Sequence, residues 1–269
     1  MARGENNYSI KIHKKPHPSA FLGAALINAE RYFLRMLKKS AIFIAVIAIV
    51  LQLVGCSSSE AVAGEEYILA ARAAYRELDS ARVDIINDDT GESEQIFIYK
   101  YDEKGMMTYS YLGKSETEQI AQYNNGYEQY TEENGEVTLL TSSDLGFCAY
   151  SRDIPYPYAD EVLILFYKQA VDSELSYIAQ NEAAIEVCHV YDVSKLAKAD
   201  IDPRATGFRV IYYFDGEGNL LFLKEVTDIT LEDGTQKTYS YSVYITERNE
   251  IEKVPNLVKV EAPENVPVI

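Results

Sequence analysis

The sequence predicts an α+β fold in which an antiparallel sheet is accompanied by an N-terminal helix and an inserted helix. Three observations support this. Short runs rich in Ile, Val, Phe and Tyr are separated by turn residues about every ten positions. Residues 65–78 carry apolar side chains at spacings of three and four, as an amphipathic helix does, and the expected stripe is Tyr67, Ala71, Ala74, Tyr75 and Leu78. Residues 159–171 repeat that spacing in mid-chain. Both helices are expected on one face of the sheet.

The most distinctive stretch precedes this predicted domain. Lys38 and Lys39 are followed by an unbroken apolar run over residues 41–51, which is the pattern of an export signal. The run ends in Leu53-Val54-Gly55-Cys56, which resembles the lipobox of bacterial lipoproteins. The resemblance implies that residues 36–55 are a signal peptide. Cys56 then becomes the first residue and carries covalent lipid, that is, diacylglycerol and a fatty acid such as palmitate.

This interpretation predicts where the protein is located. It is expected on the extracytoplasmic face of the cell membrane, with residues 56–64 as a flexible tether of small residues. The alternative is an uncleaved signal anchor that keeps the apolar run as a transmembrane helix. Residues 1–35 form no recognisable domain, and Met36 directly before the basic start is a natural translation start, so these residues could be a gene-model artefact.

The charge argues against nucleic acid as a partner. The chain has 25 Lys and Arg against 42 Asp and Glu, a net charge of −17, and eight of the basic residues but only two of the acidic ones precede Cys56. Phosphate binding requires a basic surface, which this domain lacks. The chain also has 22 Tyr and no Trp. Tyr on strands usually lies on half-buried sheet faces, and an aromatic ligand-facing surface is the alternative.

The first half of the domain reads as a meander of hairpins after the helix. Strands are expected over residues 81–87, 95–102, 106–112, 120–123, 127–131 and 136–141. Asn125-Gly126 and Asn134-Gly135 mark two of the turns, because Asn and Gly accept positive φ angles at low energetic cost.

The middle of the chain interrupts the meander. Pro155 and Pro157 indicate a loop over residues 142–158. Acidic residues at 160 and 161 suit the first turn of a helix over residues 159–171. One face of that helix would carry Val162, Leu163, Phe166, Tyr167 and Ala170. A strand over residues 163–167 is the alternative.

Strands return in the second half, over residues 184–193, 208–214, 220–230 and 236–247. The domain is therefore placed at residues 65–255, followed by a tail at 256–269. Cys148 and Cys188 could form a disulfide outside the cytoplasm or be small buried hydrophobes.

The order of the expected elements resembles that of the LolA-like superfamily, which includes LppX-type lipoproteins. The order is an acylated cysteine, a tether, a helix, a long meander, an inserted apolar helix and closing strands around residues 214–223. The resemblance covers roughly residues 65–255 and lies in the order of elements, not in a sharp motif. It implies a curved antiparallel sheet, a half-barrel, whose concave side is covered by helices. It also implies non-covalent binding of lipid or lipid-modified cargo.

The residues give little support for catalysis. His189 is the only His after Cys56, and its place on an alternating strand favours a packed or surface residue over a general base. Cys188 and His189 are adjacent and so point to opposite faces of a strand, which argues against a metal site. No G-x-S-x-G or H-E-x-x-H motif occurs. We therefore expect that the protein has no enzymatic activity and binds neither a metal ion nor a cofactor.

The function expected from these observations is binding of an apolar or lipid-like ligand by a membrane-tethered lipoprotein. Candidate lining residues are Tyr75, Leu78, Leu163, Phe166 and Tyr167, for which ordinary core packing is the competing interpretation. A protein-interaction or envelope-sensing lipoprotein with Tyr-rich strands as its binding face is the first alternative. A cell-envelope hydrolase is the second, and it would need a polar cleft at His189 or at clustered carboxylates.

Overall fold

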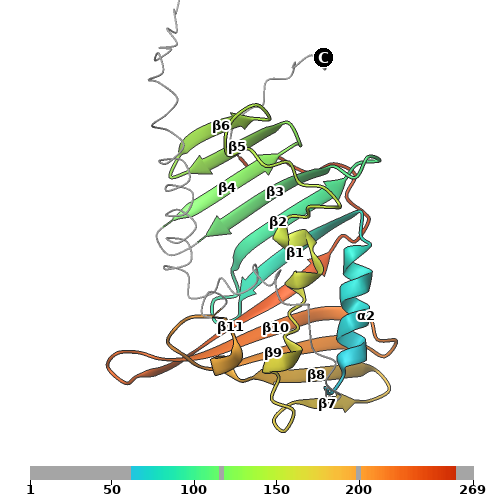
Figure 1. Ribbon diagram of the computed structural model, residues 1–269, viewed down its shortest axis with the longest axis vertical. Helices are drawn as coiled ribbons and strands as arrows, with labels where there is room; N and C mark the ends of the chain where they lie inside the picture. Colours follow the sequence, from blue (N-terminus) through green and yellow to red (C-terminus); the bar gives the residue numbers. More distant parts are fainter. Residues whose placement is uncertain (1–61, 115–117, 198–200, 259–269) are drawn as a thin grey trace, which may run out of the picture.

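The computed structural model describes residues 62–114, 118–197 and 201–258, and shows one open antiparallel sheet with a single α-helix among them. Its eleven strands lie in the order β6-β5-β4-β3-β2-β1-β11-β10-β9-β8-β7 (Figure 1). The fold is therefore mostly sheet, with less helix than the predicted α+β class. The predicted extension, signal peptide, Cys56 and most of the tether lie outside the described residues.

The first half of the sheet is the predicted meander. Its strands are β1 (Ser80–Asn87), β2 (Ser93–Tyr101), β3 (Met107–Lys114), β4 (Gln119–Asn124), β5 (Glu128–Glu133) and β6 (Glu136–Thr141). Asn134 and Gly135 both have positive φ, 53° and 82°, as a two-residue hairpin turn requires. Positive φ at Gly126 confirms the other predicted turn glycine.

The second half is a meander in the reverse spatial order. It contains β7 (Tyr177–Gln180), β8 (Ala184–Tyr191), β9 (Ala205–Asp215), β10 (Leu220–Thr230) and β11 (Gln236–Thr246). The short β7 is not among the predicted strands, because its four residues show no apolar alternation. In the structure all four are exposed. The two halves join where β1 pairs with β11, for example Val83 with Ile245.

This topology forces the chain to cross the sheet. Because β6 and β7 form opposite edges, residues 142–176 must span it, and we call them the crossing segment. Figure 1 shows it passing in front of the strands, on the same face as the helix. That face, which we call the covered face, carries the main core, with side chains from β1, β2, β3, β8, β9, β10 and β11.

The predicted inserted helix at 159–171 is wrong. The segment instead contains three 3₁₀ turns, η2 (Pro157–Ala159), η3 (Glu161–Leu163) and η4 (Lys168–Ala170). The alternative strand at 163–167 is not formed either. An α-helix rises only about 1.5 Å per residue, against about 2.0 Å in a 3₁₀ turn and more in extended chain. The irregular form reaches farther and buries three consecutive residues, Leu163, Ile164 and Leu165.

The N-terminal helix is confirmed as α2 (Glu65–Arg76). Its buried residues are Ile68, Ala71 and Tyr75. The predicted apolar stripe is therefore partly wrong, because Ile68 replaces Ala74, which is exposed. Tyr67 and Leu78 are half-buried and pack against the core.

The opposite face of the sheet is partly covered by the end of the described chain, residues 247–258. Ile251 and Val254 pack on Ile98 of β2, and Val258 packs on β4 and β5. The Lys100 ammonium donates to the carbonyl of Ile251 at 2.9 Å. Because Val258 is buried, packing continues past residue 255, where the domain was expected to end.

Candidate functional site

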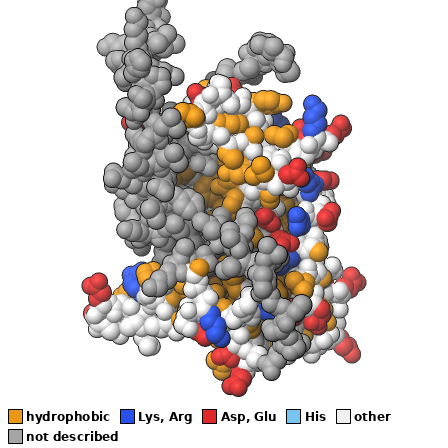
Figure 2. Space-filling model, in the orientation of Figure 1, with side chains coloured by type: hydrophobic (Ala, Val, Ile, Leu, Met, Phe, Trp, Pro, Cys, Tyr) orange, Lys and Arg blue, Asp and Glu red, His pale blue; other side chains and the backbone are white. Residues whose placement is uncertain are grey.

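The candidate site is the layer in which side chains of the crossing segment pack against the covered face, and aromatic side chains predominate there. On β2 and β3 the sheet presents Phe97, Tyr99, Tyr109 and Tyr111, in cross-strand pairs Phe97–Tyr111 and Tyr99–Tyr109. Their alternation along the strands places them all on one face, where they are buried. Figure 2 shows hydrophobic side chains gathered in the upper half of this view and charged ones along the right-hand rim.

The crossing segment adds tyrosines to this cluster. Tyr156 lies 4.8 Å from Phe97 and 4.7 Å from Tyr109, measured between ring centroids. Tyr158 stacks on Tyr111 at 5.9 Å. Burial raises the pKa of both Tyr156 and Tyr158 well above the usual range. Both hydroxyls therefore stay protonated at neutral pH and do not act as bases, and that of Tyr158 donates to the side-chain oxygen of Gln95.

The five predicted lining residues all join this core. Tyr75 on α2 is buried and donates its hydroxyl proton to the carbonyl of Tyr158, while Leu78 packs at the core margin. In the crossing segment Leu163 is buried, Phe166 lies 5.7 Å from the ring of His189, and Tyr167 lies 6.1 Å from Tyr191. The five residues therefore lie in the one layer of side chains between the sheet and the elements that cover it. Lining of a ligand site and ordinary core packing both require this placement.

The crossing segment is attached mainly at its two ends. Near β3, the amide of Met107 donates to the carbonyl of Tyr150, and the amide of Arg152 donates to the carbonyl of Gly105. Near β8, the amide of Asp172 donates to the carbonyl of Val190. Between these ends, the backbone–backbone hydrogen bonds of residues 153–169 recorded for the described chain stay within the segment. The middle part therefore rests on the sheet through side chains.

Polar side chains fasten this middle part to α2. Arg72 pairs with Glu161 at 3.0 Å, and Lys168 pairs with Glu65 at 2.7 Å. One further contact comes from the sheet, where the Tyr212 hydroxyl donates to the carbonyl of Leu165.

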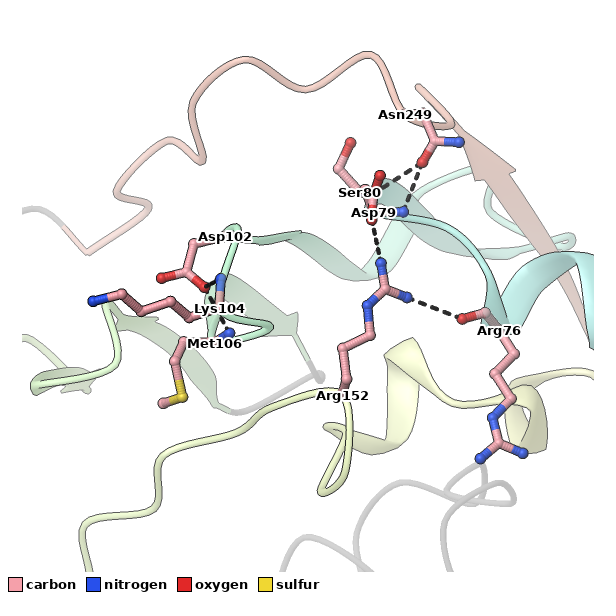
Figure 3. Close-up of polar contacts among 8 residues, drawn as sticks. All are labelled: Arg76, Asp79, Ser80, Asp102, Lys104, Met106, Arg152 and Asn249. Atoms are coloured by element: carbon pink, nitrogen blue, oxygen red, sulfur yellow. Dashed lines mark hydrogen bonds and ion pairs between the residues drawn. The ribbon is translucent and has the colours of Figure 1, made fainter.

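Arg152 fastens the start of the crossing segment to the end of α2 (Figure 3). Its guanidinium donates to the carbonyl of Arg76 at 3.2 Å, pairs with the carboxylate of Asp79 and lies 4.3 Å above the ring of Tyr101. A cation beside the last carbonyls of a helix is also favoured by the helix dipole. Asn249, which follows β11, contacts the same region, because its side-chain oxygen accepts a hydrogen bond from the amide of Asp79 at 2.7 Å.

His189 has a structural role. Its Nε2 lies 2.8 Å from the carbonyl oxygen of Ala63, which can only accept, so Nε2 carries the proton. Its Nδ1 is buried and has no partner among the described residues, and desolvation lowers the pKa of the ring. His189 thus holds the residues before α2 onto β8, in agreement with the expectation of a packed strand residue.

Glu225 on β10 is the site residue that the sequence analysis missed. It pairs across the sheet with Val210 and Tyr241 and follows the buried Leu223 by two residues, so its side chain lies on the covered face. Burial alone raises its pKa to about 8. The alternation of side chains along β10 could have revealed it. Leu223 and Ile229 are apolar residues expected to point toward the core, and Glu225 lies an even number of positions from both, so it points the same way.

The two cysteines among the described residues, Cys148 and Cys188, form no disulfide. Cys148 is exposed in the crossing segment, and Cys188 is buried on β8. Among the described residues no group of three His, Cys, Asp or Glu is arranged to hold a metal ion. Within the same ranges no helix is long and apolar enough to span a bilayer.

No family model and no curated protein sequence matches the chain. Comparison with solved structures finds the crystal structure of LprF from Mycobacterium bovis. The TM-score is 0.42 and the sequence identity 11%, over 71% of this chain and 95% of that one. At this TM-score the likeness carries no argument about ligand or activity.

Proposed function

We propose that the protein is a membrane-tethered, extracytoplasmic lipoprotein with a LolA-like half-barrel that binds an apolar or lipid-like ligand without catalysis. The ligand lies between the covered face and the middle of the crossing segment. Covalent lipid on Cys56 holds the protein to the membrane.

One observation carries the proposal. A broad apolar and aromatic sheet face is covered by a segment without α-helix that is pinned at its ends and joined to the sheet in the middle by side chains. Displacing this middle part breaks few backbone hydrogen bonds with the sheet, because residues 153–169 make theirs internally. An acyl chain could then replace Leu163 and its neighbours against the same apolar surface.

Co-purification tests ligand binding. The chain from residue 57 onward is purified from a bacterium and analysed by native mass spectrometry, followed by organic extraction. We expect a bound apolar molecule of defined mass that is lost on denaturation. A clean apo mass that is unchanged after incubation with mixed lipids would refute the ligand proposal.

Metabolic labelling tests the membrane anchor separately. Cells that express the full chain are fed a fatty acid with a clickable tag, and membrane and soluble fractions are compared. We expect label on the wild-type protein in the membrane fraction, and an unlabelled product for Cys56→Ser. Equal labelling of both proteins would contradict lipidation at Cys56.

The alternative of a Tyr-rich protein-binding face is less well supported. Most strand tyrosines of β2, β3, β8 and β9 lie on the covered face, where they are buried. On the other face, Tyr213, Phe222 and Tyr244 form a stack across β9, β10 and β11, with centroids 4.4 and 5.1 Å apart. These rings face one another, so only their edges are directed to a partner.

A further inference from the structure

Glu225 stands out as a carboxyl group enclosed by apolar and aromatic side chains. It is 7% exposed. Its cross-strand neighbours Val210 and Tyr241 are buried, and Leu223 precedes it on the same face. It is also close enough to influence the hydroxyls of Tyr158, Tyr191 and Tyr212 electrostatically, which places it beneath the crossing segment.

The three tyrosine hydroxyls that Glu225 influences have other partners. The Tyr158 hydroxyl donates to the side-chain oxygen of Gln95, and the Tyr212 hydroxyl donates to the carbonyl of Leu165. The Tyr191 hydroxyl lies 3.4 Å from that of Tyr212. Glu225 makes no hydrogen bond or ion pair recorded among the described residues.

The cations of α2 and of the middle of the crossing segment are used as well. Arg72 of α2 acts electrostatically on Tyr191 and Tyr212, as Glu225 does, but its guanidinium is paired with Glu161 at 3.0 Å. Lys168 is paired with Glu65. The described part of the chain thus holds a buried carboxyl group without supplying it with a donor or a cation.

Such a group is unfavourable without a partner, because burial removes the water that would solvate its charge. In the unliganded protein it remains neutral at pH 7, since its pKa is raised to about 8. A ligand that brings a cation would restore the ionised form and form a charge-assisted hydrogen bond in a low-dielectric site. An anionic head group could accept a hydrogen bond from the neutral carboxyl but would form no ion pair with Glu225, and the net charge of −17 disfavours its approach.

We propose that Glu225 anchors the protonated amine of an amphiphilic ligand whose apolar part lies between β8–β10 and the crossing segment. This deepens the proposed function and rests on it. The net charge of −17 favours the approach of a cation over that of an anion. The aromatic rings of Tyr191 and Tyr212 supply apolar surface beside the carboxyl group.

Three probes with the same twelve-carbon chain test the proposal: dodecylamine, dodecanol and dodecanoate. Binding to the chain from residue 57 onward is measured at pH 7 by isothermal titration calorimetry below micelle-forming concentrations. We expect dodecylamine to bind at least about tenfold more tightly than dodecanol, as a charge-assisted hydrogen bond implies. Dodecanoate should be the weakest. Binding of the amine should also release a proton from Glu225, seen as a dependence of the heat on the buffer.

Variants then locate the effect. Glu225→Gln keeps the shape of the side chain and should lose the preference for the amine over dodecanol. Glu217→Gln, in the exposed β9–β10 turn, should retain the preference and controls for surface charge. If the wild type shows no preference for the amine, or if Glu225→Gln keeps it, the inference is overturned while the binding proposal stands. If no probe binds, the proposed function itself fails.

Discussion

The buried carboxyl group of Glu225 should make stability fall as pH rises, and Glu225→Gln should abolish that slope. Its pKa is about 8 in the folded protein, against 4.5 for a glutamate exposed to water. Between these values the folded state holds one proton more than the unfolded state. The free energy of unfolding therefore decreases by about 1.4 kcal/mol per pH unit on account of this residue. Below pH 4.5 both states are protonated and the effect vanishes.

The magnitude follows from the pH interval. From pH 5 to pH 7 the contribution amounts to about 3 kcal/mol, a large fraction of the stability of a typical domain. The assay is urea unfolding of the ligand-free chain at pH 5, 6 and 7, for the wild type and for Glu225→Gln. The stability of Glu225→Gln relative to the wild type should rise by about 3 kcal/mol across this range. The comparison cancels the titration of the remaining carboxylates.

Glu217→Gln is the matched control, because its exposed side chain lies in the turn between β9 and β10 and should leave the slope unchanged. A constant stability difference between the wild type and Glu225→Gln from pH 5 to pH 7 would refute the reasoning. It would mean that Glu225 is solvated or has a partner in the folded protein. The inferred amine anchor would then lose its physical basis.

Further predictions concern the attachments of the covered face. Arg152→Ala removes the ion pair with Asp79, the bond to the Arg76 carbonyl and the contact with Tyr101, and should lower the free energy of unfolding by about 1 kcal/mol, with exposed Lys104→Ala as the control. An unchanged urea midpoint for Arg152→Ala would show that this contact is not needed. Gly64→Ala should cost about 2 kcal/mol, because residue 64 has φ of 67° and the new Cβ would lie 2.5 Å from Val187. Adding Val187→Ala should relieve only the steric part, and full recovery would contradict the backbone argument. A thiol reagent should label exposed Cys148 in the native protein and Cys188 only after unfolding, since Cys188 is buried and burial raises the pKa of its thiol. Equal native labelling of both would be incompatible with the packing of β8.

The hairpin half of the fold could be predicted from sequence because its signals are local. Alternation identifies the strands, and Asn134-Gly135 has backbone angles that few other residues accept. The N-terminal helix was predictable for the same reason, although Ile68 was missed in favour of Ala74. The helix has four alanines, which look alike in sequence, and only contact with the sheet decides that Ala71 is buried while Ala74 is exposed.

The crossing segment could not be predicted from local signals. The spacing of Leu163, Phe166 and Tyr167 suits a helix, but that spacing is uninformative where nearly every residue is apolar. What decides its form is the distance between β6 and β7, which depends on the pairing of β1 with β11. Candidate lining residues were nevertheless found, since apolarity alone places them in the core. Glu225 was missed because a charge within a strand is ordinarily assigned to the outer face.

The central pairing of β1 with β11 also bears on how the molecule assembles during synthesis. Ribosomes release the N-terminus first, so β1–β6 can form their hairpins while residues 236–246 do not yet exist. During that interval β1 is a bare edge and the rings of Phe97 and Tyr109 have no second half-sheet beside them. Long-range closure of this kind is slow. A nascent chain of this protein therefore passes through a stage in which its most aromatic surface is open to any holdase, membrane or neighbouring copy.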